Sequence, residues 1–196
     1  MTSDRLAKQI AFLVEADKLK TIDRRTPLTD GSRPENSAEH SWHLVLAALT
    51  LSEYAGGVNV PRVLALLAVH DLVEIDAGDT FAYDAAANVT KAERERAAAD
   101  RIFGLLPGDQ AAYLHGAWKE FEAFETPESR FANALDRLQA LLQNMQAGGG
   151  SWTEHRITRS QVLRRMAPVE SALPDIWPLV LDVIERFCRV GAIAND

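Results

Sequence analysis

The stretch at residues 68–80 constrains the fold most, because it places an imidazole and four carboxylates at the end of an apolar segment. Residues 63–69 are nearly all aliphatic, so the chain should carry His70 and Asp71 towards the core. Burying an unpaired charge costs several kcal/mol, which is comparable to the whole stability of a domain. The pair therefore needs compensation, and a metal ion is a compact way to provide it.

A further carboxylate follows this pair at helical spacing. Glu74 lies four residues after His70, and side chains four apart share one face of a helix. A carboxylate one turn from a bound metal can orient metal-bound water or accept its proton. We therefore predict that Glu74 is the catalytic acid-base group.

The length of 196 residues suits one domain, and we expect a single domain over residues 1–196. No apolar run reaches the roughly 18 residues of a membrane span, so we expect no membrane association. Charged residues such as Asp4 and Lys8 interrupt the N-terminal apolar residues and argue against a signal peptide. The lone Cys188 cannot form an intramolecular disulfide. A cytoplasmic location is the simplest expectation.

The net charge restricts the class of partner. The chain carries 28 acidic and 21 basic residues, for a formal net charge of −7, which argues against nucleic acid. A small anionic substrate is still compatible, because a metal and a few arginines dominate the field within a Debye length of about 8 to 10 Å.

Helical periodicity and capping residues predict an all-α fold. The expected helices cover about residues 3–19, 37–54, 60–77, 91–103, 109–124, 126–145, 158–171 and 174–190. The first should bury an apolar stripe of Leu6, Ile10, Leu13 and Val14. A capping box of Thr90 and Glu93 should start the fourth. Residues 19–36 and 78–88 have loop composition, residues 148–151 are expected to form a flexible surface loop, and no segment has a strand pattern.

Three of these helices carry residues that could bind a metal at the edges of apolar faces. They are His40 near the start of one helix, His70 with Asp71 in the next, and Asp136 in the helix over 126–145. Two imidazoles and two carboxylates suit one divalent ion such as Mn, Co, Ni, Fe or Zn, with positions left for water and substrate. We predict such a site between the helices.

In the order His, His-Asp, Asp, these residues resemble the HD-domain phosphohydrolases, which are helical metalloenzymes. Further segments, at 19–24, 34–40, 70–80, 118–122 and 126–138, resemble the YfbR-type 5′-deoxynucleotidases, and the likeness covers a core of about residues 6–145. It implies an HD-domain helical bundle with metal ligands His40, His70, Asp71 and Asp136. It also implies that Glu74 positions or deprotonates the attacking water.

The same resemblance implies substrate contacts near the metal. Arg24 would contact the phosphate, Asp79 would contact a sugar hydroxyl, and Thr80 would lie in the same pocket. Arg25 stands where the family pattern tends to have a tryptophan. We therefore expect the base to be read weakly. The helices over about 158–190 carry no motif, and we expect them to pack against the core or to contribute to a homodimer.

The predicted reaction is removal of the 5′-phosphate from (deoxy)ribonucleoside monophosphates by metal-activated water, with deoxyribonucleotides preferred. One alternative is a dinuclear-iron HD oxygenase, which would need further histidines between Asp71 and Asp136. Only His115 lies there, and His155 lies beyond. The other alternative is a degenerate HD fold that acts as a nucleotide-binding module. The presence of all four ligand positions and of the acid-base carboxylate argues against it.

Overall fold

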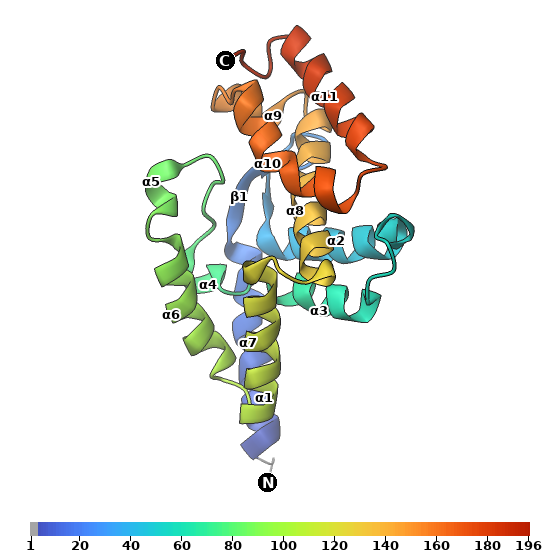
Figure 1. Ribbon diagram of the computed structural model, residues 1–196. Helices are drawn as coiled ribbons and strands as arrows, with labels where there is room; N and C mark the ends of the chain where they lie inside the picture. The colour runs from blue at the N-terminus through green and yellow to red at the C-terminus, as the bar shows by residue number, and fades with distance from the viewer. Residues whose placement is uncertain (1–3) are drawn as a thin grey trace.

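The computed structural model describes residues 4–196 and is mainly helical (Figure 1). The α-helices are α1 (Asp4–Ala16), α2 (Ser37–Leu51), α3 (Val60–Val69), α4 (Glu74–Ala77), α5 (Ala85–Asn88), α6 (Lys91–Phe103), α7 (Gly108–Ala123), α8 (Pro127–Gln146), α9 (Gly150–Glu154), α10 (Arg159–Ala172) and α11 (Trp177–Arg189). Two 3₁₀ helices, η1 (Asp17–Thr21) and η2 (Ser52–Tyr54), and two strands, β1 (Asp23–Pro27) and β2 (Pro34–Asn36), complete the fold. The predicted helical class is confirmed, and the predicted helix start at Ser3 lies outside the described residues.

Helix α8 runs through the middle of the molecule and packs against α2, α3, α7 and α10 (Figure 1). Its start is fixed locally, because the Thr126 side chain accepts a hydrogen bond from the Ser129 amide and Pro127 occupies the first turn. Phe131, Leu135 and Leu138 are buried along its core-facing side. A polar residue on this side of α8 is therefore placed between several other helices.

The start of α2 is fixed by a capping box. The Asn36 side chain accepts hydrogen bonds from the amides of Ala38 and Glu39, and the Glu39 carboxylate accepts one from the Asn36 amide. This cap places His40 in the first turn of α2, where its side chain is completely buried.

The predicted helix over 60–77 is broken at the His-Asp pair. Helix α3 ends at Val69, and α4 begins only at Glu74. Between them the amide of Leu72 bonds to the carbonyl of Val69 (3.2 Å) and the amide of Glu74 bonds to that of Asp71 (2.9 Å). These three-residue hydrogen bonds tighten the turn. His70 and Asp71 therefore lie in a turn rather than within a continuous helix.

The prediction that residues 19–36 form only a loop is wrong at β1 and β2. These strands pair antiparallel, with Asp23 opposite Asn36 and Pro27 opposite Pro34. They are short, charged and proline-containing, so they lack the alternating apolar pattern that reveals a strand in a sequence. The hairpin brings Arg24 close to the buried carboxylate of Glu35, with 3.7 Å between Arg24 Nε and Glu35 Oε2.

The predicted burial of the first helix is also wrong in this single chain. Of the residues in α1 only Phe12 is buried, whereas Leu13 and Val14 are 62% and 66% exposed. Leu6 and Ile10 are exposed as well. Helix α1 lies at one end of the molecule (Figure 1), where Arg5 and Gln9 donate hydrogen bonds to Asp109 and Gln110 of α7.

Two local predictions fail for backbone reasons. Thr90 precedes α6 in a helical conformation (φ −103°, ψ 0°), and its hydroxyl makes no capping bond. The glycines at 148–150 do not form a flexible surface loop, since Gly150 begins α9 and closely approaches β1. A Cβ on Gly150 would lie 2.6 Å from Asn144 Oδ1 and 3.0 Å from Pro27 Cγ. Glycine therefore permits this packing. No helix in residues 4–196 is long and apolar enough to cross a membrane.

Candidate metal centre

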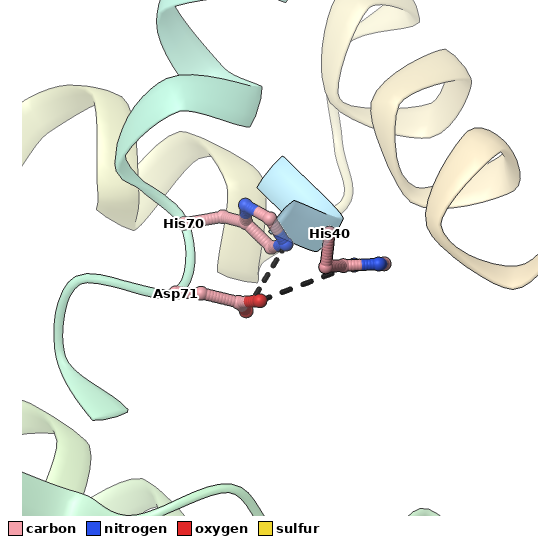
Figure 2. Close-up of side chains that lie close together, drawn as sticks. All are labelled: His40, His70 and Asp71. Atoms are coloured by element: carbon pink, nitrogen blue, oxygen red, sulfur yellow. Dashed lines mark ion pairs between the residues drawn. The ribbon is translucent and has the colours of Figure 1, made fainter. Parts of the chain in front are cut away.

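The side chains of His40, His70 and Asp71 converge between α2 and the turn that follows α3 (Figure 2). His70 Nε2 lies 3.0 Å from Asp71 Oδ1, and His40 Nε2 lies 3.9 Å from Asp71 Oδ2. One ligand atom from each residue falls within 4.8 Å of the others, and all three residues are buried. Within residues 4–196 this is the only group of three or more histidines, cysteines or acidic residues that meets this distance.

Asp136 lies next to this group rather than within it. Its Oδ1 atom is 3.1 Å from His40 Nε2. Helix α8 supplies this carboxylate, and Asp136 is 8% exposed. The structure thus brings the four predicted ligand residues together from three parts of the fold.

The hydrogen bonding of His70 fits a bound cation. Its Nδ1 lies 2.9 Å from the Leu67 carbonyl, which can only accept, so Nδ1 carries the proton. Burial lowers the pKa of His70 and favours the neutral ring. Nε2 then presents a lone pair to the Asp71 carboxylate and has no hydrogen-bond partner. A metal ion would turn this unfavourable meeting of two acceptors into ligation.

His40 is oriented by a chain of side chains behind it. Its Nδ1 donates to Gln139 Oε1 (3.0 Å), and Gln139 Nε2 donates to Glu35 Oε1 (2.8 Å). Burial and the charge of Arg24 lower the pKa of His40, but hydrogen bonds with Asp136 and Glu35 outweigh them and raise it to about 9. The Nε2 atom therefore faces carboxylates that attract positive charge. A metal ion can supply this charge, and so can a proton on the His40 ring.

Glu74 is held close to this centre at the start of α4. Its Oε2 accepts a hydrogen bond of 2.6 Å from Ser37 Oγ, which lies in the first turn of α2. Burial, followed by the charge of Asp71, raises the pKa of Glu74 well above its ordinary value. A buried carboxyl with a raised pKa beside a candidate metal site is a candidate for proton transfer.

Arg24 reaches the centre from β1. Its Nη1 donates to Asp71 Oδ2 (3.1 Å), and its Nη2 lies 3.7 Å from Asp136 Oδ1. Burial lowers the pKa of Arg24, but the charges of Asp71 and Asp136 more than compensate and raise it. Arg24 is therefore a fixed positive charge beside the candidate ligands.

Asp79 and Thr80 line a cavity of about 390 Å³ that also contains Glu74. Gly78 precedes them with φ +73°, a backbone conformation that favours glycine and turns the chain away from α4. Arg94 Nη2 donates to Thr80 Oγ1 (3.0 Å) and so fastens this loop to α6. Burial raises the pKa of Asp79. Asp79 and Thr80 thus line the same cavity as Arg24, the third predicted substrate contact.

Sequence reasoning missed several residues of this site. Gln139 and Gln143 both donate to the buried Glu35, and they follow Asp136 at positions three and seven on α8. Polar residues at helical spacing on an otherwise apolar side were a usable signal. Arg165 on α10 gave no such signal, because only the tertiary fold brings it to Asp136.

The C-terminal helices form part of the cavity wall. Trp152 of α9 and Met166 of α10 line it, and Arg165 Nη2 donates to Asp136 Oδ2 (3.2 Å). Arg137 Nη1 lies 3.5 Å from the same oxygen. Burial, followed by repulsion from Arg165, lowers the pKa of Arg137 to about 10.

The two remaining histidines considered for a second metal lie apart from the cluster. His115 stacks on Trp118, and its Nε2 is 3.5 Å from Asp100 Oδ1. His155 packs against Phe81, with ring centroids 4.6 Å apart. Within the described chain neither joins the group around His70.

Helices that meet at a His, His-Asp and Asp set are typical of HD-domain proteins, and comparison with known protein families gives the same result. The HD domain family model matches residues 16–177, so the chain belongs to the HD domain family. The predicted resemblance is therefore confirmed.

Similar proteins and a similar solved structure carry names that give an activity as well as a family. The cattle (Bos taurus) 5′-deoxynucleotidase HDDC2 is 31% identical over 190 residues, which cover 95% of this chain and 90% of that protein. The zebrafish (Danio rerio) protein of the same name is 32% identical over 111 residues, only 57% of this chain and 54% of that protein. The crystal structure of a predicted metal-dependent phosphohydrolase from Magnetospirillum magnetotacticum MS-1 is similar, with TM-score 0.93 and 50% identity over 97% of this chain and 96% of that one.

Proposed function

We propose that this protein is a metal-dependent phosphohydrolase that removes the 5′-phosphate from (deoxy)ribonucleoside monophosphates. The observation that carries the proposal is the unpartnered His70 Nε2, which faces Asp71 at 3.0 Å with His40 alongside in a buried cluster. This cluster borders a cavity that also contains Arg24 and Glu74. Relatives named 5′-deoxynucleotidase and a similar structure described as a predicted metal-dependent phosphohydrolase support the same reaction class.

The donor set fits one divalent ion. His40, His70, Asp71 and Asp136 would hold it, and two imidazoles with two carboxylates suit Mn, Co, Ni, Fe or Zn. When bound, such an ion supplies Lewis-acid activation of water and neutralises charge on the phosphoryl oxygens.

The chain's own residues provide positioning and proton transfer. The hydrogen bond from Ser37 holds Glu74 Oε2, so Oε1 is available to take the proton of the attacking water. As the water oxygen bonds to phosphorus, the P–O5′ bond breaks, and the proton held by Glu74 is available to the leaving oxygen. The planar guanidinium of Arg24 can bind two phosphoryl oxygens at once.

The loop after α4 would set the choice of sugar. We propose that Asp79 accepts a hydrogen bond from a sugar hydroxyl and that Thr80 lies beside it, which favours deoxyribonucleotides over ribonucleotides. Both residues line the cavity, and Arg94 fixes the loop through Thr80. Arg25 on β1 is exposed but also lines the cavity, and it offers no aromatic ring for stacking, so we propose that the base is read weakly.

Three further proposals concern the whole chain. We propose that residues 1–196 form one HD domain, since the family match runs to residue 177 and α10 packs on α8. We propose a homodimer, since Leu13 and Val14 on α1 and Trp42 and Leu49 on α2 are more than half exposed. We propose a cytoplasmic location, in keeping with a single cysteine.

A phosphate-release screen tests the reaction. Protein treated with chelator would be supplied in turn with Mn, Co, Ni, Mg or Zn and with ribo and deoxy nucleoside mono-, di- and triphosphates. The highest rates should occur with deoxyribonucleoside 5′-monophosphates. Two irons per chain with oxygen consumption would instead indicate an oxygenase, and nucleotide binding without phosphate release would indicate a binding module.

A further inference from the structure

Two arginines outside the predicted substrate contacts converge on one oxygen of Asp136. Arg165 Nη2 lies 3.2 Å and Arg137 Nη1 lies 3.5 Å from Oδ2. The other oxygen, Oδ1, faces His40 at 3.1 Å and Arg24 at 3.7 Å. One carboxylate therefore faces three guanidinium groups and an imidazole.

Arg137 is held in a fixed orientation. Its Nη1 donates to the backbone carbonyl of Asn133 (2.7 Å) and to Asn133 Oδ1 (2.8 Å), and its guanidinium lies 5.7 Å from the centre of the Phe124 ring. Asn133 is itself fixed by donating to the carbonyls of Phe121 and Ser129. Within residues 4–196 every side-chain hydrogen bond of Arg137 uses Nη1. Nη2 and Nε therefore retain donors for a ligand.

Arg165 approaches from a separate element, α10. Its hydrogen bond to Asp136 is the only one its side chain makes within the described chain, and that side chain is 31% exposed. Arg137, Arg165 and Arg24 all line the same cavity of about 390 Å³. The C-terminal part of the chain thus contributes a positive charge to the wall of the candidate active site.

A purely structural ion pair does not account for this arrangement. Two guanidinium groups at one carboxylate oxygen repel each other, and one of them would suffice to pair the charge. Glu122 also acts on Arg137 through its charge, but no hydrogen bond joins the two in the described residues. If Asp136 is shared with a metal, even less of its charge is left for the arginines. The unused donors of Arg137 and the part-exposed guanidinium of Arg165 therefore remain available to an anion in the cavity.

We propose that Arg137 and Arg165 form a second phosphate subsite, on the Oδ2 side of Asp136, which binds non-bridging oxygens of a terminal phosphate group. The inference rests on the proposed function and deepens it. A phosphate monoester dianion has three non-bridging oxygens, so it can engage Arg24 and this pair together. A phosphodiester has only two such oxygens and a single negative charge. The subsite would therefore select monoesters over diesters.

The test is binding of inorganic phosphate to manganese-loaded protein, measured by calorimetry and as product inhibition. The variants are Arg137→Gln, Arg165→Gln and the charge-retaining Arg165→Lys. Arg164→Gln is the matched control, because Arg164 is the adjacent exposed residue on α10. Each glutamine variant should weaken phosphate binding and raise KM about 10- to 100-fold, as expected for a lost charge-assisted hydrogen bond. Arg165→Lys should recover part of this loss, and the control should match wild type.

A second readout separates a phosphate contact from a structural role. Inhibition by the bare nucleoside, which has no phosphate, should be unchanged in the glutamine variants, and manganese content should match the control. Unchanged phosphate affinity in both glutamine variants would overturn the proposal. So would equal loss of nucleoside and phosphate binding, or loss of manganese from both variants. Failure of the proposed function is distinguishable, because wild type would then bind phosphate through these arginines yet release none from nucleotides.

Discussion

His40 Nε2 lies 3.1 Å from Asp136 Oδ1, although 96 positions separate the two residues. This contact joins α2 to α8, and both residues are buried. Asp136→Ala should therefore remove bound metal and nearly all activity. It should also cost about 3 to 5 kcal/mol of stability, because three arginines and a histidine lose a buried partner. Metal content and thermal unfolding with and without chelator measure both effects. Wild-type metal content in the variant would refute the ligand assignment.

Glu74 should act on the proton rather than on the metal. Glu74→Gln keeps the size of the side chain and can still accept the hydrogen bond from Ser37, but it cannot take a proton. We expect turnover to fall by about 10² to 10⁴ while metal content is retained. Steady-state kinetics and metal analysis on the same preparation provide the comparison. Joint loss of metal and activity would make Glu74 a ligand instead.

Asp79 should affect sugar recognition only. Asp79→Ala should lower kcat/KM for deoxyribonucleoside 5′-monophosphates. The loss of transition-state stabilisation should be about 1.5 to 3 kcal/mol, as for a hydrogen bond to a charged group. Metal content should be unchanged. The loss should disappear with a 2′,3′-dideoxynucleotide, which has no sugar hydroxyl to donate. An equal loss with that substrate would assign Asp79 a structural role, and Asp84→Ala on the exposed part of the same loop is the control.

Glu95 provides a prediction about stability and pH. Burial raises its pKa to about 7, although Lys91 at 3.4 Å opposes the shift. The folded-state pKa of Glu95 lies above its unfolded value. The contribution of Glu95 to stability is therefore fully present below about pH 4.5 and is lost as the pH rises through about 7. Glu95→Gln should therefore gain up to about 3 kcal/mol over wild type at pH 8 and differ by less than about 1 kcal/mol at pH 5.

Urea unfolding of chelator-treated protein at the two pH values measures this difference. Glu93→Gln on the exposed side of α6 serves as the control and should show no such dependence. A gain of the same size at both pH values would mean that Glu95 titrates as an ordinary exposed carboxyl.

Local signals explain which parts of the fold could be predicted. The sixth predicted helix matches α8 closely, because Thr126 and Pro127 mark its start independently of tertiary contacts. The meeting of His40, His70 and Asp71 could be anticipated because polar residues at apolar helix faces need a shared partner. Arg165 could not be found in this way, since its contact with Asp136 spans 29 positions and depends on how α10 packs. The burial of α1 could not be predicted either. Its apolar stripe was expected to be buried but is exposed, because the stripe alone does not tell which element packs on it.

Reconstitution of the metal-free protein shows whether phosphate release depends on one ion bound at His40, His70, Asp71 and Asp136. Chelator-treated wild type would be titrated with each divalent ion while phosphate release from a deoxyribonucleoside 5′-monophosphate is followed. We predict no activity without metal, recovery that saturates near one ion per chain, and no recovery in Asp136→Ala. Undiminished phosphate release from fully metal-free protein, or equal recovery in Asp136→Ala, would contradict it.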